Sequence, residues 1–161
     1  MISDLHLNLN YDENYGPRVD QEGDCWVTSG TLSDVKAPYG RYGCDPPSSL
    51  IDVMLDEFNR SHGKQDVIFL TGDLSSHHTA MDIDDTSGEN TYPLLMATHA
   101  GIIEHLNEKF PDTLVLPVFG NNDAKFHDNP IPIDDEEFFY EYIFDLWFDL
   151  LPGNKAWLTS E

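Results

Sequence analysis

Two short apolar runs constrain the fold of this 161-residue chain more than any other feature. Residues 66–71 (DVIFLT) and 113–119 (TLVLPVF) are continuous apolar runs, the pattern typical of strands buried on both faces. Each run stops at a glycine that opens a polar segment, at Gly72 and at Gly120. A third strand is expected at the N-terminus, where only residues 1–2 remain of it. The chain therefore has the beginnings of a sheet whose strands end abruptly in polar residues.

Helical patterns separate these strands. Ser48–His62 carries apolar residues at helical spacing, and we expect Asp45 or Ser48 to cap it. Two further helices are expected over residues 92–110 and 134–151. Strands that alternate with helices imply parallel strands joined by right-handed crossovers. The sequence therefore predicts a layered α/β fold with three parallel strands and crossover helices.

Residues 8–47 read as one long loop, rich in Asn, Asp, Gly, Pro and Tyr and without sustained periodicity. Loops of this length in compact domains are usually functional or tied down. Its two cysteines, Cys25 and Cys44, could be disulfide-bonded, which would stabilise the fold by about 3 kcal/mol on chain-entropy grounds. Two unrelated buried thiols are the alternative.

Composition excludes some classes of function. The chain has 30 acidic and 8 basic residues and a formal net charge of −22. Such a charge repels nucleic acid and anionic membrane surfaces, so we expect no nucleic-acid packing role. No apolar run approaches the roughly 18 residues of a transmembrane helix. Asp4 and His6 interrupt the apolar start, so this chain is expected to contain no signal peptide.

Metal-ligand residue types follow each expected strand. Asp4 and His6 follow the first, Asp73 follows the second, and Asn121 follows the third. Residues two apart in a strand point the same way, so Asp4 and His6 are expected to face one ion while Leu5 enters the core. Mixed oxygen and nitrogen donors suit zinc, iron or manganese better than calcium. An α/β domain that binds no metal remains an alternative, because each motif alone arises by chance.

Taken in order, these motifs resemble the calcineurin-like metallophosphoesterase superfamily, with its successive Asp-x-His, Gly-Asp and Gly-Asn motifs. More narrowly, the chain resembles the acid sphingomyelinase-like phosphodiesterases, a branch with endopolyphosphatase relatives. The narrower resemblance covers nearly the whole chain, and the segments that carry it are residues 2–6 (ISDLH), 11–16, 43–45 (GCD), 69–73 (FLTGD) with His77, and 117–121 (PVFGN).

The resemblance implies a role for each of these residues. Two divalent transition metal ions are expected, zinc first and iron or manganese otherwise. By the resemblance, the metal ligands are Asp4, His6, Asp73 and Asn121, with Asp73 bridging the two ions. Cys25 and Cys44 match a family disulfide, and the layered α/β sandwich of the superfamily is the implied fold.

The implied activity is hydrolysis of a phosphoester by a metal-activated water. His77 falls where the branch keeps an active-site histidine, and its neighbour His78 is the second candidate. The expected substrates carry a phosphoryl group: a phospholipid, a nucleotide or polyphosphate. An endopolyphosphatase-like hydrolase is therefore an alternative to a sphingomyelinase-like phosphodiesterase.

Two departures from the family pattern qualify the prediction. Asn122 stands where the superfamily usually has a histidine; it can hydrogen-bond a phosphoryl oxygen but cannot deliver a proton. The family's later histidine motifs are also missing, because His127 is the only histidine after Asp123. We therefore expect residues 1–161 to be the N-terminal portion, about half, of a metallophosphoesterase domain, completed by a missing C-terminal half or another subunit. A non-catalytic, structural or partner-binding relative is the main alternative.

Asn59 begins the one acceptor sequon considered, Asn59-Arg60-Ser61. Together with the cysteine pair and the resemblance, it favours a secreted protein or one in a lysosomal or vacuolar lumen.

Overall fold

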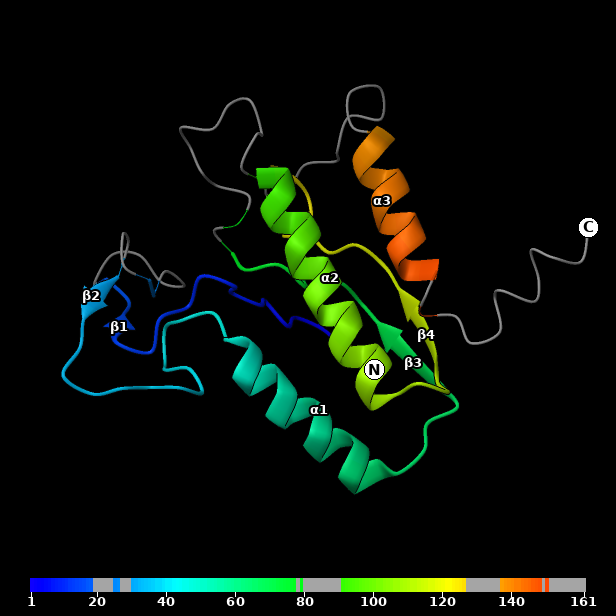
Figure 1. Ribbon diagram of the computed structural model, residues 1–161, viewed down its shortest axis with the longest axis horizontal. Coiled ribbons are helices and arrows are strands. Elements are labelled where there is room, and N and C mark those ends of the chain that lie inside the picture. The colour runs from blue at the N-terminus through cyan, green and yellow to red at the C-terminus, as the bar shows by residue number, and fades with distance from the viewer. Residues whose placement is uncertain are drawn as a thin grey trace, which may run out of the picture.

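The computed structural model describes residues 1–18, 25–26, 30–77, 79, 91–126, 137–148 and 150. Seven elements follow one another along the chain (Figure 1). They are β1 (Tyr15–Gly16), β2 (Thr31–Leu32), α1 (Ser48–His62), β3 (Val67–Leu70), α2 (Thr91–Lys109), β4 (Leu114–Pro117) and α3 (Glu137–Phe148). The bounds of α1 are those predicted, and α2 lies one residue earlier than expected at each end. The part of residues 134–151 that the structure describes as helix is α3.

The two predicted inner strands pair in parallel. β3 and β4 run side by side in register from Val67 opposite Leu114 to Leu70 opposite Pro117. The N-terminal segment lies along the other edge of β3, with parallel bridges from Ile2 to Leu70 and further along the chain. Three parallel segments are therefore present, as predicted, although the first is a pair of isolated bridges. Because β3 lies in the middle, the polar residues that follow the N-terminal segment and those that follow β4 lie on either side of Asp73.

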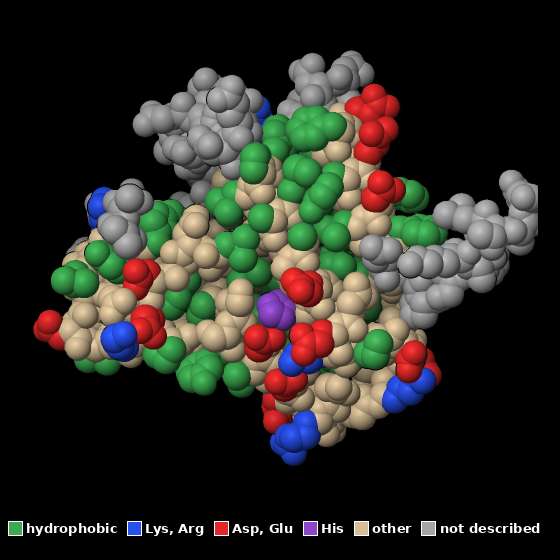
Figure 2. Space-filling view, in the orientation of Figure 1, with side chains coloured by type: hydrophobic (Ala, Val, Ile, Leu, Met, Phe, Trp, Pro, Cys, Tyr) green, Lys and Arg blue, Asp and Glu red, His purple; other side chains and the backbone are tan. Residues whose placement is uncertain are grey.

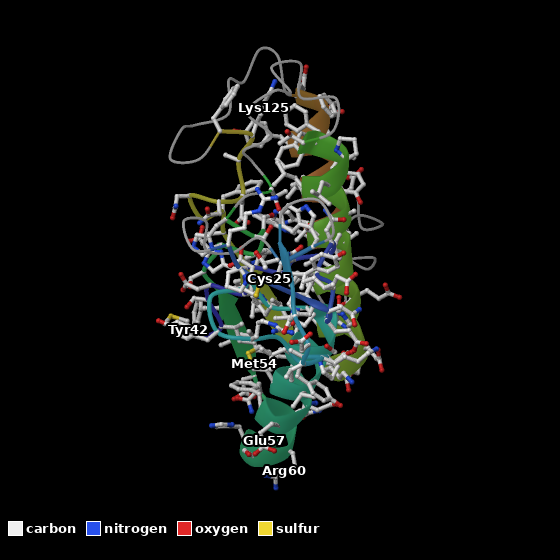
Figure 3. The ribbon with its side chains drawn as sticks, turned by 90° about the vertical axis from the view of Figure 1, so that its left-hand side faces the viewer. Cys25, Tyr42, Met54, Glu57, Arg60 and Lys125 are labelled. Atoms are coloured by element: carbon white, nitrogen blue, oxygen red, sulfur yellow. A yellow bond between two sulfur atoms is a disulfide. The ribbon has the colours of Figure 1, made fainter. Side chains whose placement is uncertain are left out.

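The helices all lie on one side of this sheet. In Figure 1 they lie in front of the strands, and in the side view of Figure 3 α2 is on the right and the strands are on the left. Helices and sheet share a core in which apolar side chains of every layer meet: Leu5, Leu7, Ile51, Leu55, Ile68, Leu70, Ile102, Ile103, Leu106 and Val115. Burying this apolar surface is the main force that holds the two layers together.

The other face of the sheet corrects the prediction that both strands are buried on both faces. Side chains alternate along β3, so Ile68 and Leu70 are buried whereas Val67 and Phe69 are exposed, the latter at 52%. Leu116 on β4 is exposed on the same pattern. A continuous apolar run cannot distinguish a strand covered on both faces from one covered on one face. Within the described residues, this open face of the sheet has no covering layer.

The long segment 8–47 is less irregular than predicted. β1 and β2 form a short antiparallel ladder within it, with Tyr15 opposite Leu32. Cys25 and Cys44 are joined by a disulfide, one of the two outcomes left open by the cysteine count. The elements are only two residues long, too short to leave a periodic pattern in the sequence. Tyr42 projects from the left-hand edge of Figure 3 and is 98% exposed.

The prediction that Asp45 or Ser48 caps α1 is wrong. Pro47 occupies the cap position, and no side chain bonds to the first turn of the helix. Asp45 instead bonds to His77, as described below.

Acidic and basic side chains lie next to one another at one end of the helical layer. Figure 2 shows acidic and basic groups side by side over α1 and the adjoining end of α2, where Lys109 lies 2.8 Å from Asp56. None of the helices within the described residues is long and apolar enough to span a membrane.

Candidate metal centre

Three of the predicted ligands have an unusual backbone. Asp4, His6 and Asp73 have φ angles of 56°, 43° and 54°, and among the described residues they alone have positive φ without being glycine. This left-handed conformation costs about 1 to 3 kcal/mol for such residues and is concentrated at functional sites. The three therefore stand apart from the rest of the described chain by backbone geometry alone.

The same three residues bring their ligand atoms together. One ligand atom from each lies within 4.8 Å of the other two, and His6 Nε2 is 3.9 Å from Asp4 Oδ1. Leu5 between them is buried, as predicted, but Asp4 and His6 are not in extended strand. We expected the alternation of side chains along a strand to bring Asp4 and His6 together. Instead, their ligand atoms meet where the backbone is left-handed.

The local hydrogen bonds fix this turn against the end of β3. The Asp4 N–H donates to the Gly72 carbonyl at 3.2 Å, and the His6 N–H donates to the Asp73 carbonyl at 2.9 Å. His6 Nδ1 is 3.1 Å from the Ser75 carbonyl oxygen, so this ring nitrogen is engaged and Nε2 is the one left for an ion.

A pair of glycines lets the ends of β3 and β4 touch. A side chain on Gly72 would collide with the backbone of Gly120, and one on Gly120 would collide with the Asp73 carboxylate. The Asn122 N–H donates to Asp73 Oδ1 at 2.9 Å. Asn121 thus lies between two residues that both contact Asp73, next to the candidate centre.

Asn122 itself is buried, and its side-chain oxygen has no hydrogen-bond partner among the described residues. Its contact with the centre is made through the backbone N–H.

Asp123 holds the two strand ends together, a role that the sequence reasoning missed. Its carboxylate is fully buried and accepts four backbone N–H bonds of 2.8 to 3.0 Å. The donors come from both strand ends: Asp73, Leu74, Ser75 and Gly120. The available signal in the sequence was an aspartate three residues after Gly120, the glycine that ends the last strand.

His99 on α2 lies beneath this carboxylate. Its Nε2 is 3.6 Å from Asp123 Oδ1, and neither ring nitrogen has a hydrogen bond within the described part of the chain. Burial lowers the pKa of His99 below its ordinary value of 6.5, against the opposing effect of the Asp123 charge. The ring is therefore neutral at pH 7, and it packs as the core histidine that its helical position suggests.

His77 lies beside the candidate centre. Its ring stacks on His6, with ring centroids 4.0 Å apart and planes 16° apart. His78 and His127 lie outside the described residues. Asn59 is exposed on α1, and its side-chain amide donates to the Lys109 carbonyl at 3.1 Å; whether it carries a glycan stays a prediction.

The residues present fit a transition metal. Two carboxylates and one imidazole converge on one point, which is the mixed donor set that zinc, iron and manganese accept in proteins. Nearby carboxylates repel each other when they share no cation, so the arrangement favours a positive ion among them.

The fold and the site define an α/β protein with a candidate transition-metal centre at the carboxyl ends of parallel strands. Comparison with known proteins confirms the predicted resemblance: over nearly its whole length the chain is similar to acid sphingomyelinase-like phosphodiesterases. It is 30% identical to acid sphingomyelinase-like phosphodiesterase 3b of Mus musculus over 162 residues, which cover 99% of this chain and 31% of the mouse protein.

Two further relatives extend the match. Sphingomyelin phosphodiesterase A of Dictyostelium discoideum is 26% identical over 160 residues, or 99% of this chain and 25% of that protein. Endopolyphosphatase of Schizosaccharomyces pombe is 27% identical over 136 residues, or 78% of this chain and 22% of that protein. No model of a protein family matches the chain.

The chain spans about a third or less of the length of these curated relatives.

Proposed function

We propose that the chain contributes the first part of the active site of a metal-dependent phosphodiesterase. The observation that carries the proposal is that ligand atoms of Asp4, His6 and Asp73 lie within 4.8 Å of one another at the ends of the strands. All three residues have a left-handed backbone. The related phosphodiesterases support the reaction class, since they are named for cleavage of phosphoester bonds.

Asp4, His6 and Asp73 are the proposed ligands of a first ion, zinc by preference and iron or manganese otherwise. Asp73 and Asn121 are the proposed ligands of a second ion. Divalent ions at such a site lower the pKa of a bound water and neutralise the phosphoryl oxygens. The protein's own contribution is to fix the ligands: Asp73 is held by the Asn122 N–H, and His6 by the Ser75 carbonyl.

We propose that this chain acts as part of a longer enzyme. Four ligands, one of them shared, are fewer than two ions require. The open face of the sheet, which includes Phe69 and Leu116, supports the same view, because exposed apolar surface of this kind favours a further covering layer. A C-terminal portion or another subunit would supply both.

The proposed substrates carry an accessible phosphoryl group. Relatives named for sphingomyelin and for polyphosphate favour a phospholipid head group or a polyphosphate, and a nucleotide presents the same chemistry. The disulfide and these relatives support an oxidising compartment, either outside the cell or in a lysosomal or vacuolar lumen.

The test is hydrolysis of bis(p-nitrophenyl) phosphate by the longer enzyme of which this chain is the proposed first part, loaded with zinc, manganese or iron. We expect metal-dependent release of nitrophenolate that falls at least about tenfold in Asp73→Asn, because this variant removes the charge of the shared ligand. Asp112→Asn, an exposed aspartate elsewhere, should keep the activity. Hydrolysis that persists in Asp73→Asn would contradict the proposal.

A non-catalytic, partner-binding role is the second candidate, and Asn122 favours it. This residue stands at the position of the family's usual histidine, it is buried, and it cannot donate a proton. Absence of tightly bound metal, together with no hydrolysis of the nitrophenyl ester by the longer protein under any of the three metals, would favour this second role.

A further inference from the structure

One carboxylate near the candidate centre is used by neither the metal-ligand set nor a helix cap. Asp45 follows the disulfide-bonded Cys44, and only 9% of its side chain is exposed. A buried carboxylate needs hydrogen-bond donors or a positive partner. Among the described residues, the donors to Asp45 both belong to His77.

Both oxygens of Asp45 bond to His77. Oδ1 lies 2.8 Å from the ring nitrogen Nδ1, and Oδ2 accepts the backbone N–H, also at 2.8 Å. An ionised carboxylate only accepts hydrogen bonds, so Nδ1 of the neutral ring must carry the proton. The other ring nitrogen, Nε2, is then the acceptor; it has no hydrogen bond to the part of the chain that the structure describes, and its side chain is 51% exposed.

The chain on each side of Asp45 is anchored. Cys44 is linked to Cys25, and the Pro46 carbonyl accepts the Asn8 N–H at 2.9 Å. The carboxylate is therefore presented from a fixed backbone rather than from a loose loop, which is what a group that orients another must have.

His77 in turn is placed against a proposed metal ligand. Its ring lies flat on the His6 ring at a centroid distance of 4.0 Å. The Asp45 bond limits rotation about the side chain of His77, and the stack limits the direction of its ring plane. Together they hold Nε2 in one place beside the centre.

We propose that Asp45 is a positioning residue for His77. It fixes the Nδ1–H tautomer and the ring orientation, so that Nε2 can accept a hydrogen bond from a P–OH group of the substrate or from a water at the adjacent centre. The proposal rests on the proposed function and adds to it a residue outside the metal ligands. A carboxylate that orients a histidine in this way is a recurrent arrangement in enzymes.

The first measurement does not depend on metal or activity. Long-range ¹⁵N NMR of the metal-free chain at pH 8.5 reports which nitrogen of each neutral imidazole carries the proton, and His77→Gln assigns the signal. We expect the Nδ1–H form to predominate for His77. In Asp45→Asn the amide can donate to Nδ1, so the population should move toward Nε2–H, and Asp45→Glu should restore the original form. A purely structural role of Asp45 would leave the tautomer unchanged.

Asp52→Asn is the matched control. Asp52 on α1 lies 2.9 Å from Nδ1 of His105 on α2, so it forms the same kind of pair away from the candidate centre. This variant should alter the His105 signal and leave that of His77 unchanged.

The second measurement links the pair to the proposed function. Inorganic phosphate at pH 7 carries a P–OH group that can donate to Nε2. Its binding to the zinc-loaded chain should therefore weaken about tenfold in Asp45→Asn, because the Nε2–H form cannot accept this hydrogen bond, and should not change in Asp52→Asn. If zinc does not bind at all, the proposed function fails while the tautomer measurement still decides the role of Asp45. The inference would be overturned if His77 of the wild type were in the Nε2–H form, a result that does not require Asp45→Asn to fold. It would also be overturned if the tautomer of His77 were the same in Asp45→Asn as in the wild type.

Discussion

At the scale of single residues, the candidate centre depends on groups that do not bind the ion. The Asp123 carboxylate accepts N–H bonds from both strand ends, and Asp45 holds His77 from the disulfide-bonded segment. Supporting groups of this kind fix the direction of ligands and are often as important as the ligands themselves. Their effects can be separated from chemistry because they should change stability or orientation in the absence of metal.

Asp123→Asn should destabilise the metal-free protein by about 2 to 4 kcal/mol. The amide keeps one acceptor oxygen but turns an NH₂ group toward backbone N–H donors, which leaves buried donors unpaired. Urea unfolding followed by circular dichroism measures the change. Asp112→Asn, which removes an exposed aspartate, should stay within about 0.5 kcal/mol of the wild type. Equal stabilities for the two variants would contradict the role assigned to Asp123.

Stability should also fall in mild acid because of His99. Its pKa is lowered in the folded protein, so below pH 6.5 the unfolded chain binds a proton that the folded chain does not. The free energy of unfolding then decreases as pH falls, by up to about 1.4 kcal/mol per pH unit, until the pH reaches the lowered pKa. Urea unfolding with EDTA at pH 7.5 and 5.5 should show a smaller acid loss for His99→Gln than for the wild type. Identical losses would show that His99 is not buried in the neutral form.

At the scale of elements, the contact between the ends of β3 and β4 determines whether the centre forms. Gly120 allows this contact because any side chain there would meet the Asp73 carboxylate. Gly120→Ala should therefore lower zinc affinity at least about tenfold and destabilise the fold, as overpacking does, by about 1 to 3 kcal/mol.

Gly101→Ala is the control for this variant. Its new methyl group would come no closer than 3.8 Å to Leu7, and it lies within α2, where alanine is the better helix former. This variant should bind zinc normally and unfold no more easily than the wild type. Normal zinc binding by Gly120→Ala would show that the two strand ends need not touch.

Prediction from sequence succeeded for elements with a long, regular pattern. The helix Ser48–His62 has the predicted bounds, and β3 and β4 lie inside the predicted apolar runs. The candidate ligands Asp4, His6 and Asp73 could be named from their positions at strand ends. Their left-handed backbone could not, because Asp and His adopt positive φ more often than most residues but still only in a small minority of cases.

Other features are tertiary and leave no local pattern. The partner of Asp45 is 32 positions away along the chain, so its local position suggested a helix cap instead. Whether β3 is covered on one face or two depends on layers elsewhere, and an apolar run carries no information about them. The two-residue strands β1 and β2 are too short for any periodicity.

At the scale of the whole molecule, a net charge of −22 opposes the compact state by self-repulsion. The Debye length shortens from about 30 Å at 0.01 M salt to about 10 Å at 0.1 M, so added salt should relieve this repulsion. We expect Tm to rise by several degrees between 20 and 300 mM NaCl (on the order of 2 to 4 °C per kcal/mol), as calorimetry can measure. Choline chloride should act in the same way, because the effect is screening. A falling Tm would mean that ion pairs such as that of Lys109 with Asp56 outweigh the repulsion.

The central claim is that Asp4, His6 and Asp73 bind one transition metal ion together. X-ray absorption on the chain with one equivalent of zinc tests this claim most directly, because it reports the nearest ligands themselves. The account predicts a shell of oxygen and nitrogen at about 2.0 to 2.2 Å that includes one imidazole, with no sulfur, and loss of the imidazole signal in His6→Gln. An imidazole signal unchanged in His6→Gln, or a shell of water oxygens alone, would contradict it.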